Sequence, residues 1–214
     1  MITIVDYGTG NIRSIENMLR VLGHESRISR DPEDIVRASK IILPGVGHFD
    51  YGMRQLRSSG LIGVLGESVM SRHVPVLGIC LGAQLLTRRS DEGSEPGLGW
   101  VSAETRCFDR RRLPESLRIP HMGWADTEYQ LGHPLFAGFA ETPRFYYVHS
   151  YHMVCDDPNN ELCHAVHGYR FVSGVVRENI LGVQFHPEKS HRFGKLILDN
   201  FAKWFPQRGA GEFA

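Results

Sequence analysis

Two short motifs, far apart in the chain, carry residue types that could together perform nucleophilic catalysis. The first is Gly78-Ile79-Cys80-Leu81-Gly82, at the end of an apolar run. A strand that ends in G-x-C-x-G and leads at once into a helix is typical of a nucleophile elbow, here with cysteine in place of serine. The helix N-terminus favours the thiolate, and the backbone N–H of Leu81 would point toward a forming oxyanion. Taken alone, the motif also fits a buried core cysteine.

The second motif is His186-Pro187-Glu188, which follows a short apolar run. A cysteine nucleophile needs a base, and the base needs a group that orients it. Residues two apart in an extended segment point to the same side, and Pro187 fixes a non-helical local geometry. We therefore expect Glu188 to hold the imidazole of His186 in one tautomer while His186 faces Cys80.

A third motif, Pro44-Gly45-Val46-Gly47, also comes directly after an apolar run. The glycines on both sides of Val46 allow backbone amides to line an anion site, or to change the orientation of a peptide. Without the other two motifs, this segment would be interpreted only as a turn.

The elements that must position these motifs alternate in the first half of the chain. Short β-branched runs are separated by amphipathic segments, and this βαβα order predicts a central, mostly parallel sheet with helices on both faces. The predicted strands are 2–5, 24–29, 40–43 and 74–79, and the predicted helices are 12–22, 51–57, 61–71 and 81–87, with another helix start at 31–34.

The second half of the chain predicts further strands, antiparallel or mixed, that extend the same sheet. Gly, Pro and Asn turns separate them, and the chain ends in an amphipathic helix. The predicted strands are 99–108, 144–149, 161–167, 171–177 and 180–185, and the helix is 193–205. Because no repeat or linker interrupts the pattern, we expect one domain over residues 1–205 and a frayed tail over 206–214.

The bulk composition excludes several classes of protein. Lys plus Arg and Asp plus Glu both total 24 in 214 residues, which argues against a nucleic-acid or membrane-surface protein. No apolar run approaches the ~20 residues that a membrane span needs. The start of the chain has no signal-peptide pattern and the cysteines lack C-x-x-C spacing, so we expect a cytoplasmic enzyme with reduced thiols and no metal site. The short basic run Arg110–Arg112 is expected to be a solvated loop, or else to contact a partner or a phosphate.

Several segments, read together, resemble one family. They are D-Y-G-T-G-N, L-P-G-V-G, L-G-I-C-L-G-A-Q-L-L, P-H-M-G-W, V-H-S-Y and G-V-Q-F-H-P-E-K-S. The chain resembles class I (triad-type) glutamine amidotransferases over nearly its whole length, and specifically the glutaminase subunit of imidazole glycerol phosphate synthase. The resemblance implies a flavodoxin-like α/β fold without a cofactor. It also implies that Cys80 attacks glutamine, that His186 moves the proton and that Glu188 orients His186, so that a glutamyl thioester forms and ammonia leaves.

The resemblance also implies roles for residues outside the triad. The oxyanion site maps onto the backbone of Val46 and Leu81, and the partner contacts onto Tyr146 and Lys189. The glutamine-binding positions map onto Gly47, Gln84, Glu92, His149 and Ser150. The partner of this family is a (β/α)8-barrel cyclase, which uses the ammonia to form imidazole glycerol phosphate and AICAR in histidine synthesis. Glutamine hydrolysis is expected to be slow until the partner and its nucleotide bind, with the P-G-V-G peptide as the switch.

Some positions depart from the commonest pattern of this family. They are His48, Ala83, Trp100 and the segment 191–194. These resemble a branch of paralogues that supply ammonia for sugar amidation in surface-polysaccharide synthesis, so the pathway stays open. Two further hypotheses are a catalytically idle binding subunit and a cysteine hydrolase of peptides or γ-glutamyl compounds. The Gln84 and V-H-S-Y matches weigh against the hydrolase. His121 and Trp124 are expected in a packed turn beside the sheet, or in a segment that faces the partner.

Overall fold

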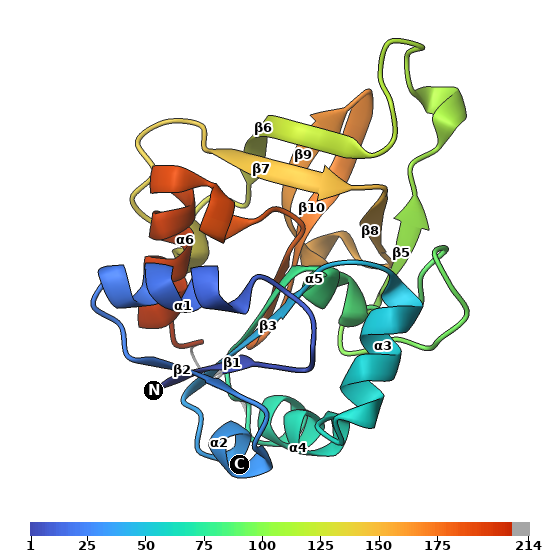
Figure 1. The fold of residues 1–214 in the computed structure, drawn as a ribbon. Coiled ribbons are helices and arrows are strands. Elements are labelled where there is room, and N and C mark those ends of the chain that lie inside the picture. Colours follow the sequence, from blue (N-terminus) through green and yellow to red (C-terminus); the bar gives the residue numbers. More distant parts are fainter. Residues whose placement is uncertain (207–214) are drawn as a thin grey trace, which may run out of the picture.

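The computed structural model describes residues 1–206, and their strands form one mixed sheet of eleven strands (Figure 1). One part, in the order β2-β1-β3-β4-β11, is parallel; β10, β9, β6 and β7 continue it as antiparallel strands, and β8 pairs with β10 and β5. The strands are β1 Ile2–Val5, β2 Ser26–Ser29, β3 Lys40–Gly45, β4 Val76–Cys80, β5 Ala103–Cys107, β6 His121–Tyr129, β7 Arg144–His149, β8 Tyr151–Cys155, β9 Glu161–His167, β10 Tyr169–Arg177 and β11 Ile180–Val183.

Helices cover both faces of the parallel part of the sheet (Figure 1). The α-helices are α1 Ile12–Val21, α2 Pro32–Val36, α3 Phe49–Ser58, α4 Ile62–Gly66, α5 Leu81–Leu85 and α6 His191–Lys203. Two of their ends follow the sequence signals closely. Asp31 caps α2 by accepting the N–H of Glu33 at 2.9 Å, and Gly23 ends the α1 turn with a φ of +81°.

The side chains of each parallel strand divide between two hydrophobic cores. Ile42 of β3 packs in the core that contains α1 and α6, whereas its neighbours Ile41 and Leu43 pack in the core that contains α2, α3, α4 and α5. This alternation is the period-two pattern of a strand buried on both faces. The predicted α/β fold, with a parallel core and helices on both faces, is confirmed.

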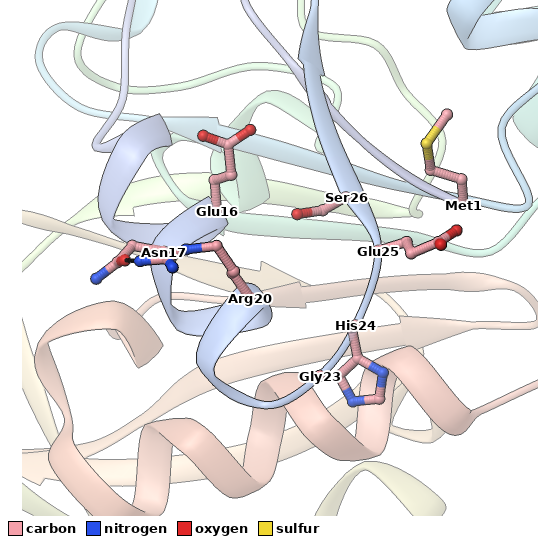
Figure 2. A pocket seen from close by; sticks show the side chains of 8 residues that line it. All are labelled: Met1, Glu16, Asn17, Arg20, Gly23, His24, Glu25 and Ser26. Atoms are coloured by element: carbon pink, nitrogen blue, oxygen red, sulfur yellow. Dashed lines mark hydrogen bonds between the residues drawn. The ribbon is translucent and has the colours of Figure 1, made fainter.

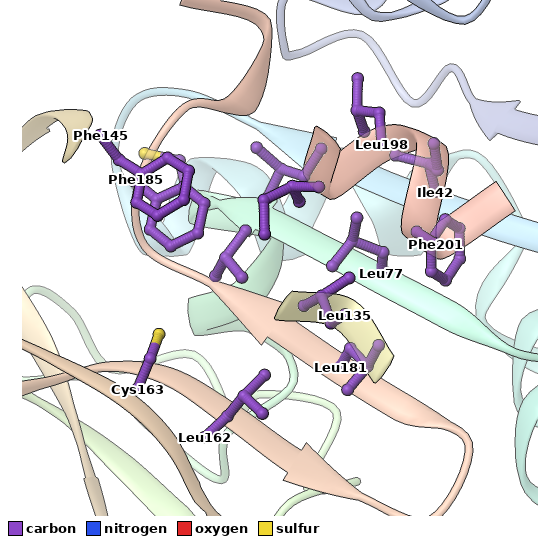
Figure 3. Close-up of a cluster of buried hydrophobic side chains, with 14 of the residues drawn as sticks. Ile42, Leu77, Leu135, Phe145, Leu162, Cys163, Leu181, Phe185, Leu198 and Phe201 are labelled. Carbon is purple, nitrogen blue, oxygen red and sulfur yellow. The ribbon is translucent and has the colours of Figure 1, made fainter. Parts of the chain in front are cut away.

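The first core reaches the residues that precede the H-P-E motif (Figure 3). The ring of Phe185 stacks on Phe145 of β7, with centroids 3.8 Å apart and planes 7° from parallel. Both rings are fully buried and belong to the same core as Leu181 and Leu198. The segment next to His186 is therefore anchored by packing as well as by hydrogen bonds.

The antiparallel half differs from the predicted pattern at two strands. The P-H-M-G-W segment is not a turn, because it forms the first half of β6, which pairs with both β7 and β9. β8 follows β7 after Ser150 alone and was also not predicted. Both strands mix polar and apolar residues, and β6 contains Gly123, so neither shows a continuous apolar run. The predicted strand 99–108 is shorter in the structure, since β5 covers Ala103–Cys107.

Several helix predictions also change in their bounds, and the helix predicted over 51–57 is longer, since α3 covers Phe49–Ser58. The predicted helix 61–71 consists of α4 followed by a π-helical turn, Glu67–Ser71, and α6 lies slightly earlier than predicted, at His191–Lys203. α5 ends at Leu85 rather than at residue 87. The predicted tail 206–214 lies outside the described residues except for Pro206.

Candidate active site

Cys80 stands at the end of β4 in a strained backbone conformation, directly before α5 begins at Leu81. Its φ and ψ are +54° and −113°, a backbone conformation that residues other than glycine rarely adopt. The turn needs a glycine on its far side, because a Cβ at Gly82 would lie 1.8 Å from the carbonyl oxygen of Leu43. The Cys80 side chain is 7% exposed. This is the geometry of a nucleophile elbow.

His186 and Glu188 form a buried hydrogen-bonded pair close to this elbow. Nδ1 of His186 lies 2.9 Å from Oε1 of Glu188, and because a carboxylate can only accept, Nδ1 carries the hydrogen. The contact forms through a 3-10 turn over Pro187–Lys189, not through the extended segment that was predicted. β11 lies next to β4 in parallel register, so the cysteine motif and the H-P-E motif stand at neighbouring strand ends.

The protonation of His186 follows from these neighbours. Burial acts to lower the pKa of His186, but attraction from Cys80 and Glu188 outweighs burial and raises the pKa to about 10. Nε2 of His186 has no hydrogen-bond partner among residues 1–206. The imidazole can therefore hold a proton at neutral pH and present it from Nε2 to a leaving group.

Three hydrogen bonds hold the turn that carries His186, and two of them join it to β7. The N–H of His186 donates to the carbonyl of Tyr146 at 2.9 Å. The hydroxyl of Ser190 donates to the carbonyl of His186 at 2.6 Å and accepts the N–H of Tyr146 at 3.0 Å. Tyr146, predicted as a partner contact, therefore positions His186 through its backbone.

The two predicted oxyanion donors differ in whether their backbone N–H groups are already hydrogen-bonded. Leu81 opens α5, so its N–H is among the first donors of a helix, which have no partner inside the helix. The N–H of Val46 instead donates to the hydroxyl of Thr9 at 3.1 Å, and the same hydroxyl donates to the carbonyl of Val46 at 2.6 Å. The side chain of Thr9 thus holds both ends of this residue.

The predicted glutamine-binding positions lie around the ends of β3, β4 and β7, and two of them make hydrogen bonds that show how they are held. Glu92 accepts the N–H of Phe49 at 2.7 Å, where α3 begins. The amide nitrogen of Gln84 points inward, 2.9 Å from Oε1 of Gln184 and 3.4 Å from the carbonyl of Tyr151. Only Oε1 of Gln84 is then left to contact a substrate.

The other two glutamine-binding candidates with informative surroundings are His149 and Ser150. The imidazole of His149 turns into the sheet, where Nε2 lies 3.1 Å from Nδ1 of His121 and Nδ1 lies 2.6 Å from the carbonyl of Tyr151. Ser150 forms the break between β7 and β8 and is half-buried. The backbone of His149, not its ring, is therefore the part that could meet glutamine. Gly47 adopts a φ of +99°, directly after Val46.

The predicted partner contacts lie together beside the site. Nζ of Lys189 is 5.7 Å from the ring centroid of Tyr146, and the ring of Trp124 meets Tyr146 edge to face at 6.2 Å. Tyr146 is half-buried and its neighbour Tyr147 is fully buried, since successive side chains of a strand point to opposite faces.

Two contacts with this site were not predicted from the sequence. They are the Thr9 hydroxyl on Val46, and the amide of Gln184, whose Nε2 lies 3.7 Å from Sγ of Cys80. Thr9 and Val46 are 37 positions apart, and Gln184 and Cys80 are 104 positions apart. No local pattern signals either contact.

A separate hollow lies at the opposite end of the parallel strands, between α1 and the start of β2 (Figure 2). It is lined by Met1, Glu16, Asn17, Arg20, Gly23, His24, Glu25 and Ser26. None of the predicted site residues lines it. Within residues 1–206, no group of three or more His, Cys, Asp or Glu side chains is arranged to hold a metal ion, and no helix there is long and apolar enough to cross a membrane.

Comparison with known proteins agrees with this site. Residues 3–204 match the family described as glutamine amidotransferase class-I. A solved glutamine amidotransferase superposes with a TM-score of 0.72 at 19% identity, covering 95% of this chain and 100% of the other. PurLQS from Thermotoga maritima superposes with a TM-score of 0.71 at 21% identity, covering 94% and 97%. Fold and site define a class-I glutamine amidotransferase.

Curated relatives narrow this assignment. Imidazole glycerol phosphate synthase subunit HisH 2 of Pseudomonas aeruginosa is 50% identical, covering 95% of this chain and 99% of the relative. The subunit HisH 2 of Methanococcus maripaludis is 47% identical over the same shares, and the subunit HisH of Bdellovibrio bacteriovorus is 45% identical over 95% and 100%. The chain belongs to this HisH family within the class-I glutamine amidotransferases.

Proposed function

We propose that this chain hydrolyses glutamine to glutamate and ammonia, and that it supplies the ammonia to a synthase subunit in histidine biosynthesis. The observation that carries the proposal is a strained Cys80 at the start of a helix, close to the buried His186–Glu188 pair, in a chain that belongs to the HisH family. Residues 1–205 would act as one glutaminase domain in the cytoplasm, without a metal or cofactor.

In the proposed reaction, the sulfur of Cys80 attacks the side-chain carbonyl carbon of glutamine. The carbonyl oxygen becomes an oxyanion, which accepts hydrogen bonds from the backbone of Leu81 and Val46. His186, held protonated by Glu188, gives its proton to the departing amine, and ammonia leaves. The glutamyl thioester is then attacked by water, whose proton passes to His186, and release of glutamate restores the sulfur.

The Val46 peptide gives a physical reason for slow hydrolysis before the partner binds. Its N–H is bound to Thr9, so it cannot donate to the oxyanion in this state. Gly45 and Gly47 flank it, and Gly47 already has a positive φ, so the peptide can rotate at low cost. A partner that favours the rotated state would raise the rate by shifting this equilibrium.

We propose a (β/α)8-barrel cyclase as that partner, docking on the outer face of β6 and β7 beside Tyr146 and Lys189. Exposed apolar side chains support this face: Met122 is 64% exposed and Trp124 is 40% exposed. Patches of this kind mark interaction sites. The products would be imidazole glycerol phosphate and AICAR, and neither nucleic acid nor a membrane takes part.

A second candidate is a paralogous subunit that supplies ammonia for sugar amidation in surface-polysaccharide synthesis. The observation in its favour is that the relatives at 50% and 47% identity are both numbered HisH 2. The departures from the family pattern divide between two roles. His48 caps α3, since its Nδ1 accepts the N–H of Asp50 at 3.2 Å, whereas His191 stacks on Trp124 at 5.3 Å. Only the second lies where a different partner would be met.

Complementation of a histidine auxotroph that lacks the glutaminase subunit distinguishes the two pathways. The gene for this chain, expressed with its cognate cyclase, should restore growth without histidine, and the Cys80→Ala variant should not. If growth fails while the purified pair still releases glutamate, the enzyme class stands and the polysaccharide pathway replaces the histidine pathway.

A further inference from the structure

Behind the elbow, a hydrogen-bonded series of buried amide side chains ends at the sulfur of Cys80. Gln184 is fully buried, and its backbone N–H donates to the carbonyl of Ser173 at 2.8 Å. Its side-chain Nε2 lies 3.7 Å from Sγ of Cys80, and its Oε1 lies 2.9 Å from Nε2 of Gln84. Nε2 of Gln84 also lies 3.4 Å from the carbonyl oxygen of Tyr151.

The carbonyl of Tyr151, at the far end of this series of amides, determines the direction of each hydrogen bond in the series. The carbonyl of Tyr151 can only accept, so Gln84 must turn its NH2 group toward it. The second hydrogen of that NH2 group is then available to the other neighbour, which must present an oxygen. Gln184 therefore turns Oε1 to Gln84 and its own NH2 group to the sulfur of Cys80. A backbone carbonyl thus determines that Cys80 faces a donor and not an acceptor.

A neutral donor at this position favours one form of the sulfur. A hydrogen bond to the charged form of a group stabilises that form, so an N–H directed at Sγ favours the thiolate, which is the nucleophile. Unlike His186, an amide does not take up or lose a proton near neutral pH, so it adds to thiolate stability without competing for the proton that catalysis moves. It also limits the side-chain positions that the sulfur can occupy inside the elbow.

We propose that Gln184 is a catalytic residue that donates to Sγ of Cys80, and that Gln84 is a positioning residue that fixes the orientation of the Gln184 amide. This inference rests on the proposed glutaminase function and adds a role for Gln84 beyond substrate contact. Oε1 of Gln84 stays free for glutamine, while its nitrogen serves the sulfur.

The test measures how fast iodoacetamide alkylates Cys80 in the full chain alone, from pH 5 to pH 9, by mass spectrometry of the Cys80 peptide. Gln184→Leu removes the donor, and Gln184→Glu replaces it with an oxygen. Each should slow alkylation at pH 6.5 roughly five- to tenfold and move the half-maximal rate to higher pH. With the cyclase present, kcat for glutamine should fall by a similar factor while KM stays unchanged, because Gln184 is buried away from the substrate.

Gln84→Glu is the sharper variant, because it leaves Gln184 in place. A carboxylate cannot donate to Oε1 of Gln184, so the Gln184 amide should turn over and present its oxygen to the sulfur. The pH profile of alkylation should then move as it does in Gln184→Glu. Asn179→Ala is the matched control: Asn179 is a buried amide just before β11, bonded to the carbonyls of Val69 and Val74, and its loss should lower the melting temperature without moving the profile.

Unchanged alkylation profiles in the Gln184 variants and in Gln84→Glu, with melting temperatures lowered as in Asn179→Ala, would overturn the inference and leave the amides a structural role. Alkylation does not require the partner, so it separates the two claims. If the profiles shift but the wild type shows no Cys80-dependent glutaminase activity with the cyclase, the proposed function fails while the assignment of the donor stands.

Discussion

Among single residues, the chemistry depends most on a charge pair that water hardly reaches. The side chains of His186 and Glu188 are 2% and 1% exposed, and Oε2 of Glu188, the oxygen that does not face His186, has no hydrogen-bond partner among residues 1–206. Buried charges persist only when an opposite charge compensates them. Glu188 is therefore needed both to orient the imidazole and to keep it protonated.

The Glu188→Gln variant tests this dependence. It keeps a group that can accept from Nδ1 but removes the charge, so the imidazole loses its main compensation and its fixed tautomer. We expect kcat for partner-activated glutamine hydrolysis to fall about a hundredfold or more, with little change in KM. Glu161→Gln is the matched control, because Glu161 also pairs with a histidine, His164, at 2.7 Å but away from the site. Equal activity in the two variants would contradict the role of Glu188.

Removal of the Thr9 hydroxyl is predicted to raise the rate of glutamine hydrolysis, not to lower it. Thr9→Val keeps the shape of the side chain but removes the group that holds the Val46 peptide, so the rotated state should become easier to reach. Because a hydrogen bond contributes about 1 kcal/mol, glutamine hydrolysis by the chain alone should rise roughly fivefold. Thr9→Ser retains the hydroxyl and should behave like the wild type. Unchanged or lower activity of Thr9→Val in the absence of the partner would argue against this gate.

Among the secondary-structure elements, β6, β7 and β9 meet in a buried cluster of histidines packed on Phe108. His121 of β6 lies 3.1 Å from His149 and stacks on His167 of β9 at a centroid distance of 4.4 Å. Burial, together with the charge of His167, lowers the pKa of His121 to about 4. His149 immediately precedes Ser150, so this cluster supports the loop predicted to bind glutamine.

The cluster predicts that the fold loses stability in mild acid. Between pH 7 and pH 5 the unfolded His121, with a pKa near 6.5, takes up a proton, whereas the folded His121 does not. The free energy of unfolding should therefore fall by about 2 kcal/mol at pH 5 through this residue alone. Urea unfolding at both pH values, on the wild type and on His121→Phe, measures this contribution. The same loss in both proteins would show that His121 does not cause it.

The elements also show which parts of the fold the sequence determines locally. The strands β1, β3 and β4 are mostly apolar runs, because they are buried on both faces, and all three were predicted. β6 could not be predicted in this way. One face of β6 is exposed, and the acidic residues Asp126 and Glu128 stand on that face, in alternation with more buried residues. Its pairing with β7 and β9 is a tertiary contact.

For the molecule as a whole, the outer face of β6 and β7 is the surface most suited to a partner. Met122 is paired across the two strands with Val148, and Trp124 with Tyr146, so their side chains form one exposed patch beside the catalytic turn. The backbone of Tyr146 holds His186, which connects this surface directly to the active site.

Trp124→Ala should weaken binding of the cyclase about tenfold or more, because large aromatic side chains carry most of the energy of an interface. The dissociation constant can be measured by isothermal titration calorimetry. Leu131→Ala is the control, since Leu131 is 87% exposed in a turn after β6. If the two variants bind the cyclase equally well, the partner docks elsewhere.

The sequence motifs predict which residues form the candidate site, but they do not predict the tertiary contacts that hold those residues in place. The residue types and their neighbours in sequence identify Cys80, His186 and Glu188, because each stands at a recognisable strand end. The restraints on them, such as Ser190 on His186 and Gln184 on Cys80, join segments that meet only in the folded chain. The same holds for His149, whose ring turns into the core although its sequence position suggests the pocket.

The measurement that tests the central claim most directly is glutamate release from glutamine by the wild type and by Cys80→Ala, each alone and with the cyclase and its nucleotide ligand. We predict slow release by the wild type alone, a strong increase with the liganded cyclase, and none above background from Cys80→Ala in either state. Release that persists in Cys80→Ala would contradict the proposed chemistry, and release by the wild type at full rate without the cyclase would contradict the gate at Val46.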